Sequence, residues 1–517
     1  MKKSLFLFAA FVGFFCNGTE AESAESVRLV TDKQVYVAGD LIWCSAFCTD
    51  GEKLSSASAV AYVELVSSDG VAATSKIALV GGRGTGVMPL PASIPTGNYK
   101  IFAYTAISET ATASDISVFN TMSGIRVRGG VEICDDELPK AIGGRVVEGP
   151  VSIRTEKLGE VMRIILYNGS SKDATVAVSV SEDDALRPAF SPQMITLTPR
   201  EAEPDGEIVR AFVYGPDALS VRNRPWLTAL ISSPGSAADT YTGKIGSDGI
   251  ITFNTNNIYG DRDLVCEILG LEDEKLDCHF SPQSPFVTPD GLSFEKMRLS
   301  PSMRQALAAR HEALKAEAKA DTLYDFLPKR DNLLFSSKDC TNYHLDDYTR
   351  FNTIEDILLE LVPNVGVRKV KGHKQIKMII ADALAKTRSS NVLVMLDGVP
   401  VSNHERLLAY DALALSDVYV YPYNYAMGKT VFSGVVNFVT AKHDMSALRF
   451  ADNVRIIDFR GCSFPLALKE GSAAPGEPAG RTLLWQPALS IKAGESAEFS
   501  MSASDAALFI KLISLNY

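Results

Sequence analysis

The stretch LIWCSAFCT, residues 41–49, has the alternating pattern of a β-strand and decides the fold class. Successive residues of a strand point to opposite sides of a sheet, so every second side chain shares a face. One face carries Leu41, Trp43, Ser45 and Phe47, and the other carries Ile42, Cys44, Ala46 and Cys48. This stretch therefore predicts one strand of a β domain.

Segments of the same kind surround this strand. Further strands are predicted at residues 61–66, 76–80 and 99–104. Turn residues separate them at Ser68-Asp69-Gly70 and Pro95-Thr96-Gly97. We expect residues 22–122 to form one β-sandwich of immunoglobulin size.

The chain of 517 residues is too long for a single core and should divide into several units. The pattern after residue 122 predicts a second β-sandwich at 123–199, a third at 200–290, a helical linker at 291–345, a small α+β domain at 346–445 and a C-terminal β segment at 446–517. The predicted fold class is mainly β: tandem immunoglobulin-like β-sandwiches with a small α+β domain and a helical linker.

Two helices stand out in the second half of the sequence. Ser300-Pro301 has the residues of an N-cap followed by proline, and residues 303–320 are rich in helix-forming types, so a helix that spaces two halves of the molecule is predicted. Thr353 begins a capping box, and apolar residues at helical spacing follow it until Pro363.

The first residues have the composition of an export signal. Lys2 and Lys3 precede an apolar run that ends at Cys16, and a cut after Ala21 is predicted, so residues 1–21 are interpreted as a signal peptide. Lipid attachment at Cys16 is the alternative. No later apolar run approaches the length of a membrane-spanning helix. We expect an exported protein, periplasmic or associated with the outer membrane.

Charge argues against nucleic acid as a partner. The chain has a net charge of −11, and removal of residues 1–21 would make it more negative by one unit. Nucleic-acid-binding proteins are typically basic.

The cysteines suggest one disulfide. Cys266 and Cys278 lie symmetrically about Glu272, and Gly270 opens the intervening turn-like segment, so a hairpin would bring the two thiols within bridging distance. Two buried free thiols are the alternative. The six histidines lack the spacing of metal ligands, so neither a metal site nor a cofactor is predicted.

Four tyrosines form the candidate partner-binding surface. They recur at every second position, as Tyr419, Tyr421, Tyr423 and Tyr425. An extended segment would place their rings on one face, and Pro422 favours a strand edge or end. Packing in a core is the alternative. Asp397-Gly398 follows an apolar strand and predicts a turn rather than a catalytic carboxylate. No nucleophile motif occurs, so an enzyme is not expected.

Residues 31–43 (TDKQVYVAGDLIW), with Leu90-Pro91 and Thr96-Gly97-Asn98-Tyr99, resemble the opening strands of macroglobulin-like domains. The resemblance implies a β-sandwich of about 90 residues. The reactive thioester sequence Cys-Gly-Glu-Gln of alpha-2-macroglobulins is absent, so covalent protease trapping does not carry over.

Two further resemblances concern the later domains. Residues 200–287, with Gly206 and Ser247-Asp248-Gly249, are similar to the carboxypeptidase-regulatory-like sandwich, a non-catalytic module. Residues 393–401 (LVMLDGVPV) and 434–440 (GVVNFVT) resemble the plug of TonB-dependent outer-membrane receptors. The residues after Asp444 could supply at most about seven spanning strands, so a plug-like domain without a barrel is expected.

These resemblances favour a non-catalytic binding or scaffolding protein of the Gram-negative envelope, accessory to an outer-membrane system of the TonB-dependent type. Its expected partner is an envelope protein, such as an outer-membrane receptor. The alternatives are a surface adhesin of stacked β-sandwiches and an unrecognised envelope hydrolase.

Overall fold

The chain is mainly β, and its sheets are organised as tandem sandwich-like domains with few helices. The computed structural model describes residues 25–122, 131–134, 143–182, 192–222, 224, 226–235, 239–271, 276–287, 289, 291–317, 324–326, 337–370, 372–381, 389, 391–427, 430–445, 447–468, 482–503 and 507–516. The predicted signal peptide and Cys16 lie outside this range. The described helices include none that is both long and apolar enough to cross a membrane.

The first sandwich packs a four-stranded sheet against a seven-stranded sheet. The smaller sheet contains β1 (Ser26–Thr31), β3 (Leu41–Asp50), β4 (Lys53–Leu54) and β7 (Arg83–Pro89). The larger contains β2 (Val35–Val37), β5 (Val60–Ser67), β6 (Gly70–Ala78), β8 (Gly97–Tyr104), β9 (Thr110–Phe119), β15 (Gln193–Thr196) and β32 (Cys462–Ser463). Two of these strands come from distant parts of the sequence: β15 pairs with β9, and β32 pairs with β6.

Strand β3 has the two faces that its sequence predicts. Ile42, Cys44, Ala46 and Cys48 lie in the core of the first sandwich. On the opposite face Phe47 is fully buried in a different apolar cluster, which includes Trp485 and Ile513 of the second sandwich. The strand is therefore covered on both sides.

The second sandwich is made from two separate parts of the chain. One sheet has the order β11 (Gly144–Glu148), β36 (Leu508–Asn516), β14 (Ala174–Glu182), β34 (Thr482–Ile491), and the other has the order β12 (Val151–Leu158), β13 (Val161–Asn168), β35 (Ser496–Ser502). Residues 446–517 thus do not form a segment of their own. Their last three strands complete the domain that residues 123–199 begin, because β14 needs partners on both edges and finds them in β34 and β36.

The third domain is one curled sheet around its own core. Its strand order is β21 (His279–Pro282), β16 (Ile208–Tyr214), β19 (Ile250–Asn254), β18 (Asp239–Ile245), β17 (Thr228–Ser233), β20 (Asp261–Leu269), β31 (Arg455–Arg460), and the short helix α1 (Ala218–Arg222) follows β16. The last strand again comes from the returning C-terminal part of the chain.

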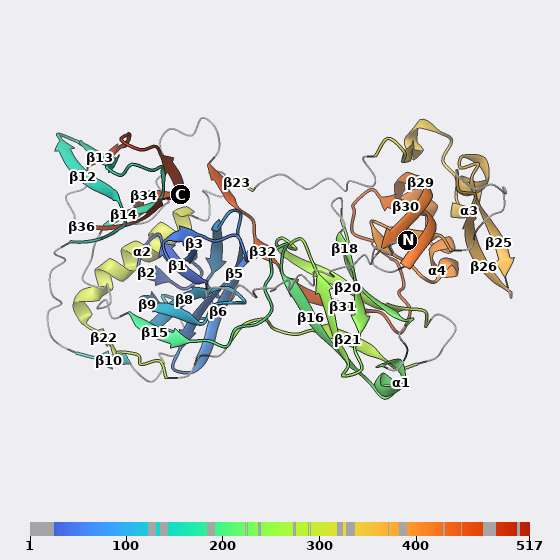
Figure 1. Cartoon of the computed structure of the whole chain (residues 1–517), viewed down its shortest axis with the longest axis horizontal. Helices are drawn as coiled ribbons and strands as arrows, with labels where there is room; N and C mark the ends of the chain where they lie inside the picture. Colours follow the sequence, from blue (N-terminus) through green and yellow to red (C-terminus); the bar gives the residue numbers. More distant parts are fainter. Residues whose placement is uncertain are drawn as a thin grey trace, which may run out of the picture.

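The predicted linker helix is present but does not separate two halves. Helix α2 (Arg304–Glu317) follows the single turn η1 (Pro301–Met303) and lies against the first sandwich (Figure 1). Met303 is buried beside Val35 and Val37, and the Arg310 Nη1 donates to the Val35 carbonyl at 3.0 Å. These contacts dock the helix, so its prediction as a spacer was wrong. Before the helix, β22 (Met297–Leu299) pairs with β10 (Val131–Ile133).

The α+β domain lies at the opposite end of the molecule from the second sandwich (Figure 1). Its sheet has the order β24 (Thr341–His344), β29 (Leu415–Met427), β30 (Thr430–Thr440), β27 (Leu393–Leu396), β28 (Val399–Pro400). Around it lie η2 (Leu345–Asp347), α3 (Ile354–Glu360), α4 (His404–Leu408), η3 (Ala412–Ala414) and the hairpin of β25 (Val365–Val370) and β26 (His373–Met378). Thr353 caps α3 as predicted, since its side chain accepts from the Asp356 N–H at 3.1 Å. A remaining pair joins β23 (Tyr324–Phe326) to β33 (Leu466–Leu468).

Candidate functional site

The four tyrosines of the predicted partner-binding surface all lie on β29 and are all half-buried. Val418 and Val420 fill the alternate positions and are buried in the core of the α+β domain. A register shift between Tyr421 and Asn424 interrupts the pairing of β29 with β30 at Pro422 and Tyr423. The proline therefore lies at an irregularity, where its missing N–H disturbs no regular ladder.

Tyr421 and Tyr425 contact an apolar cluster at the boundary between two domains. We call this cluster the apolar junction; it contains Leu393, Met395, Met427, Phe432 and Val435 of the α+β domain with Leu230 and Leu269 of the third domain. The rings of Tyr421 and Tyr425 meet edge to face, with centroids 6.4 Å apart. Part of the surface that the sequence assigns to an external partner is thus packed against a cluster that the α+β domain shares with the third domain.

Polar contacts at the β27–β28 turn reinforce the same boundary. The Asp397 and Gly398 backbones have φ values of +48° and +78°, which is the geometry of a tight hairpin turn. The Thr240 hydroxyl of the third domain donates to the Gly398 carbonyl at 3.1 Å, and the Gly235 N–H donates to the Asp397 carbonyl at 3.3 Å.

The Asp397 side chain is buried and stabilises this turn. Its carboxylate accepts from the Thr440 N–H and hydroxyl, both at 2.7 Å, and from the Met445 N–H at 2.9 Å. With its oxygens engaged inside the fold, Asp397 has the role of a structural residue, in line with the turn that its sequence predicts.

A second boundary, between the first sandwich and the third domain, is built from buried charge. Lys76 of β6 places its Nζ 2.6 and 2.8 Å from the two carboxylate oxygens of Glu207, and each side chain is 2% exposed. The same Nζ lies 4.3 Å from the ring centroid of Phe459, on β31. We call this group the charged junction. Buried ions require such partners because desolvation otherwise disfavours them strongly.

Glu203 forms a neighbouring contact across the same boundary. The Tyr62 hydroxyl lies 2.9 Å from each of its carboxylate oxygens, and the Ile208 N–H donates to it at 2.8 Å. Burial raises the pKa of Glu203 to about 6 even though these hydrogen bonds favour the charged form. Burial and the Glu203 carboxylate also raise the pKa of Tyr62 well above its usual value.

The predicted hairpin between Cys266 and Cys278 does not form, and both thiols are free. Cys266 of β20 lies opposite Ile231 and Arg455, because β17 and β31 occupy both edges of that strand. Cys278 directly precedes β21, which pairs with β16 instead. Both side chains lie in the core of the third domain, where burial raises the pKa of Cys266 to about 12 and that of Cys278 to about 11.

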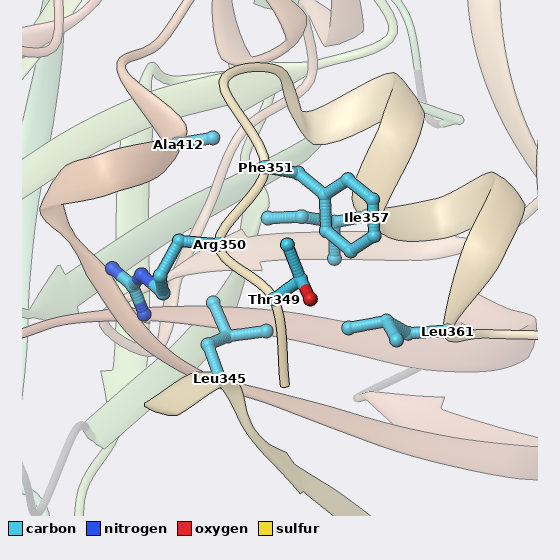
Figure 2. A pocket seen from close by; sticks show the side chains of 7 residues that line it. All are labelled: Leu345, Thr349, Arg350, Phe351, Ile357, Leu361 and Ala412. Atoms are coloured by element: carbon cyan, nitrogen blue, oxygen red, sulfur yellow. The ribbon is translucent and has the colours of Figure 1, made fainter. Parts of the chain in front are cut away.

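The hollow shown in Figure 2 lies among η2, α3 and η3 of the α+β domain. It is too narrow to admit a water molecule. The Arg350 guanidinium beside it donates to the carbonyls of Leu413 and Leu415 at 2.8 and 2.6 Å, so its charge is used within the fold. Within the described ranges, no three His, Cys, Asp or Glu side chains are grouped closely enough to hold a metal ion.

Sequence reasoning did not find the charged junction. Lys76 and Glu207 are 131 positions apart, and Phe459 comes from the returning C-terminal part. The available signal was Lys76 itself, a charged residue directly before the apolar Ile77 within a predicted strand.

Comparisons with known proteins add little. The sequence matches no protein-family model and no curated protein. Among solved structures, native Escherichia coli alpha-2-macroglobulin aligns over 96% of this chain and 22% of its own length, with 8% identity and a TM-score of 0.17. Trypsin-activated E. coli alpha-2-macroglobulin aligns over 95% and 41%, with 10% identity and a TM-score of 0.18. Salmonella alpha-2-macroglobulin reacted with methylamine aligns over 95% and 39%, with 8% identity and a TM-score of 0.17. The chain spans less than half the length of these structures, and at such TM-scores the likeness carries no argument.

Proposed function

We propose that the chain is a non-catalytic binding scaffold of a Gram-negative cell envelope, accessory to an outer-membrane system of the TonB-dependent type. The observation that carries the proposal is the path of residues 455–463. They add β31 to the third domain and then β32 to the first sandwich, so one short segment fastens two domains together. A protein whose domains are fastened in this way can present its surfaces in a fixed arrangement.

The α+β domain is the proposed partner-binding end. It lies at one end of the molecule (Figure 1), and its 393–401 and 434–440 segments resemble a receptor plug in sequence. Exposed apolar side chains such as Leu359, which is 76% exposed on α3, are available there for contact with another protein. The location in the envelope rests on the export signal that residues 1–21 predict.

Photo-cross-linking in intact cells tests this proposal. A benzoylphenylalanine replaces Leu359 in one variant and Leu158, which is 55% exposed on the second sandwich, in a matched control. The expected result is an adduct from position 359, but not from 158, that mass spectrometry identifies as an outer-membrane barrel receptor.

Other outcomes decide for the alternatives. Adducts with host proteins on the outside of the cell would favour a surface adhesin. Turnover of an envelope polymer by the purified chain would favour a hydrolase. Capture from neither position would contradict the scaffold proposal.

A further inference from the structure

The β25–β26 hairpin is a basic element in an acidic chain. Its residues 365–378 include no acidic side chain, and their basic members are Arg368, Lys369, Lys371, Lys374 and Lys377. The whole chain has a net charge of −11. The hairpin lies at the outer end of the α+β domain, away from the other domains (Figure 1). It therefore presents a local positive field at one end of the molecule.

The two faces of the hairpin differ. Val365, Ile376 and Met378 are buried in the core of the α+β domain and fix the inner face. The opposite face carries the exposed Arg368 and the half-exposed Lys377, which alternate with these apolar residues along their strands. Packing thus explains the inner face but does not require basic residues on the outer one.

Like charges face each other across the hairpin. Lys369 of β25 is directly opposite Lys374 of β26. Lys374 has an ion pair with Glu355 of α3, whereas Lys369 is exposed and forms no salt bridge with any described residue. Directly opposed like charges destabilise a strand pair, so this arrangement favours an external anion beside Lys369.

The two outer edges of the hairpin also differ. The N–H groups of Lys374 and Ile376 point away from β25, and α4 accepts them through Glu405 at 2.9 Å and His404 at 3.1 Å. Burial lowers the pKa of His404 to about 4, so its ring is neutral and can accept. The edge of β26 is covered in this way.

The edge of β25 pairs with no other described strand. Lys369 and Val367 lie directly opposite Lys374 and Ile376 in the ladder. Because directly opposed residues of an antiparallel pair share one hydrogen-bonding orientation, the backbone N–H groups of Lys369 and Val367 also point away from the partner strand. The N–H groups of Val367 and Lys369 are therefore without an acceptor among the described residues.

We propose that an acidic, extended peptide segment of a partner protein adds to the β25 edge as a third strand. Carboxylates on alternate residues of that strand would lie beside Lys369 on one face or Arg368 on the other. Two copies of this chain could not pair there, because their basic side chains would meet. A flat anionic membrane fits less well, since it offers no extended backbone to pair with the outward N–H groups of Val367 and Lys369. The inference rests on the proposed function, because it specifies the chemistry of the bound partner.

Fluorescence anisotropy with the full chain tests the proposal. The probe is a fluorescein-labelled peptide of five Thr-Glu repeats, and the comparison peptide has five Thr-Lys repeats. We expect the Thr-Glu peptide to bind and the Thr-Lys peptide not to bind. The double substitution Arg368→Glu with Lys369→Glu should lower the affinity for the Thr-Glu peptide at least about tenfold, because it reverses the charge at the edge of β25.

A matched variant and a blocked peptide separate strand addition from general attraction. Lys172→Glu with Lys492→Glu makes the same charge change at exposed positions of the second sandwich and should alter affinity less than about twofold. A Thr-Glu peptide N-methylated at every backbone nitrogen cannot donate to the edge of β25 from either of its own edges and should bind at least about tenfold more weakly.

Three results would overturn the inference: equal effects of the two charge-reversal pairs, undiminished binding of the N-methylated peptide, or binding to phosphatidylglycerol vesicles without binding to the peptide. If the Thr-Glu peptide does not bind while position 359 still captures a receptor in cells, only the strand-addition inference fails. If the peptide binds but no envelope protein is captured, the proposed function fails instead.

Discussion

The third domain is held on its two sides by different chemistry. Toward the first sandwich it uses the charged junction, in which Lys76 and Glu207 are both buried. Toward the α+β domain it uses the apolar junction, in which Leu230 and Leu269 share one apolar cluster with Met427, Phe432 and neighbouring side chains. The same domain therefore has one boundary that depends on a matched pair of ions and one that depends on buried apolar area.

This difference determines how each boundary should respond to change. A buried ion that loses its partner keeps its desolvation cost, so one substitution in the charged junction should have a large effect. When an apolar side chain of the apolar junction is shortened, the loss in free energy of unfolding should scale with the buried apolar surface removed and the volume of the cavity left behind. Glu203, beside the charged junction, should make that boundary respond to pH, because burial raises the pKa of its carboxyl to about 6.

The largest effect is expected from Glu207→Ala. It leaves the buried Lys76 ammonium unpaired and should lower the free energy of unfolding by about 4 kcal/mol. Urea denaturation of the variant and the parent measures the loss. Glu201→Ala is the control, because its ion pair with Arg210 is at the surface and should contribute less than about 1 kcal/mol.

A double substitution sharpens this prediction. Lys76→Met with Glu207→Leu removes both ions and should recover most of the stability that Glu207→Ala loses. Equal losses for the single and double variants would contradict a role for unpaired charge.

Leu230→Ala should have the next largest effect. The side chain is 1% exposed in the apolar junction, and its removal leaves a cavity that should cost about 3 kcal/mol. The same denaturation experiment measures it, with Leu219→Ala as the control because Leu219 is 71% exposed. Comparable effects of the two leucine variants would show that the junction is not packed as described.

The pH response of Glu203, beside the charged junction, comes third. The pKa of Glu203 is about 6 in the folded chain and about 4.5 in the unfolded chain, so its protonated form favours folding. Its contribution is full below pH 4.5 and should be lost as pH rises through 6, a change of about 2 kcal/mol. Denaturation between pH 4 and 7 tests this, with Glu203→Gln expected to remove that part of the profile. An identical pH profile for the parent and the variant would refute it.

The smallest effect is expected at the β29 tyrosines. Tyr425→Ala removes a half-buried ring and its edge contact with Tyr421, and should cost about 1 kcal/mol. Tyr425→Phe keeps the ring and should be neutral in the same assay. A larger loss in Tyr425→Phe than in Tyr425→Ala would show that the hydroxyl, not the ring, holds the boundary.

Local patterns predicted single elements well. The alternation in residues 41–49 located β3 and both of its faces, and Thr353 located the start of α3. Asp397-Gly398 was identified as a turn, because the dipeptide tolerates the positive φ that the turn requires.

Contacts between distant residues were not predictable in this way. Periodicity shows that β34, β35 and β36 are strands but not that they pair with β13 and β14 more than 300 positions earlier. The Cys266–Cys278 prediction failed for the same reason, since it assumed that sequence neighbours pair whereas β17 and β31 take both edges of β20. The tyrosine spacing was visible, but the packing of Tyr421 and Tyr425 against a cluster shared with the third domain was not.

The completion of the second sandwich by C-terminal strands is tested most directly by amide hydrogen exchange on β14. Both neighbours of this strand, β34 and β36, come from residues beyond 481. In a chain shortened to residues 22–480, β14 should lose most of its protection, whereas β5, whose neighbours β6 and β8 remain, should keep its own. Unchanged protection of β14 in the shortened chain would contradict the account and indicate domains that follow one another linearly.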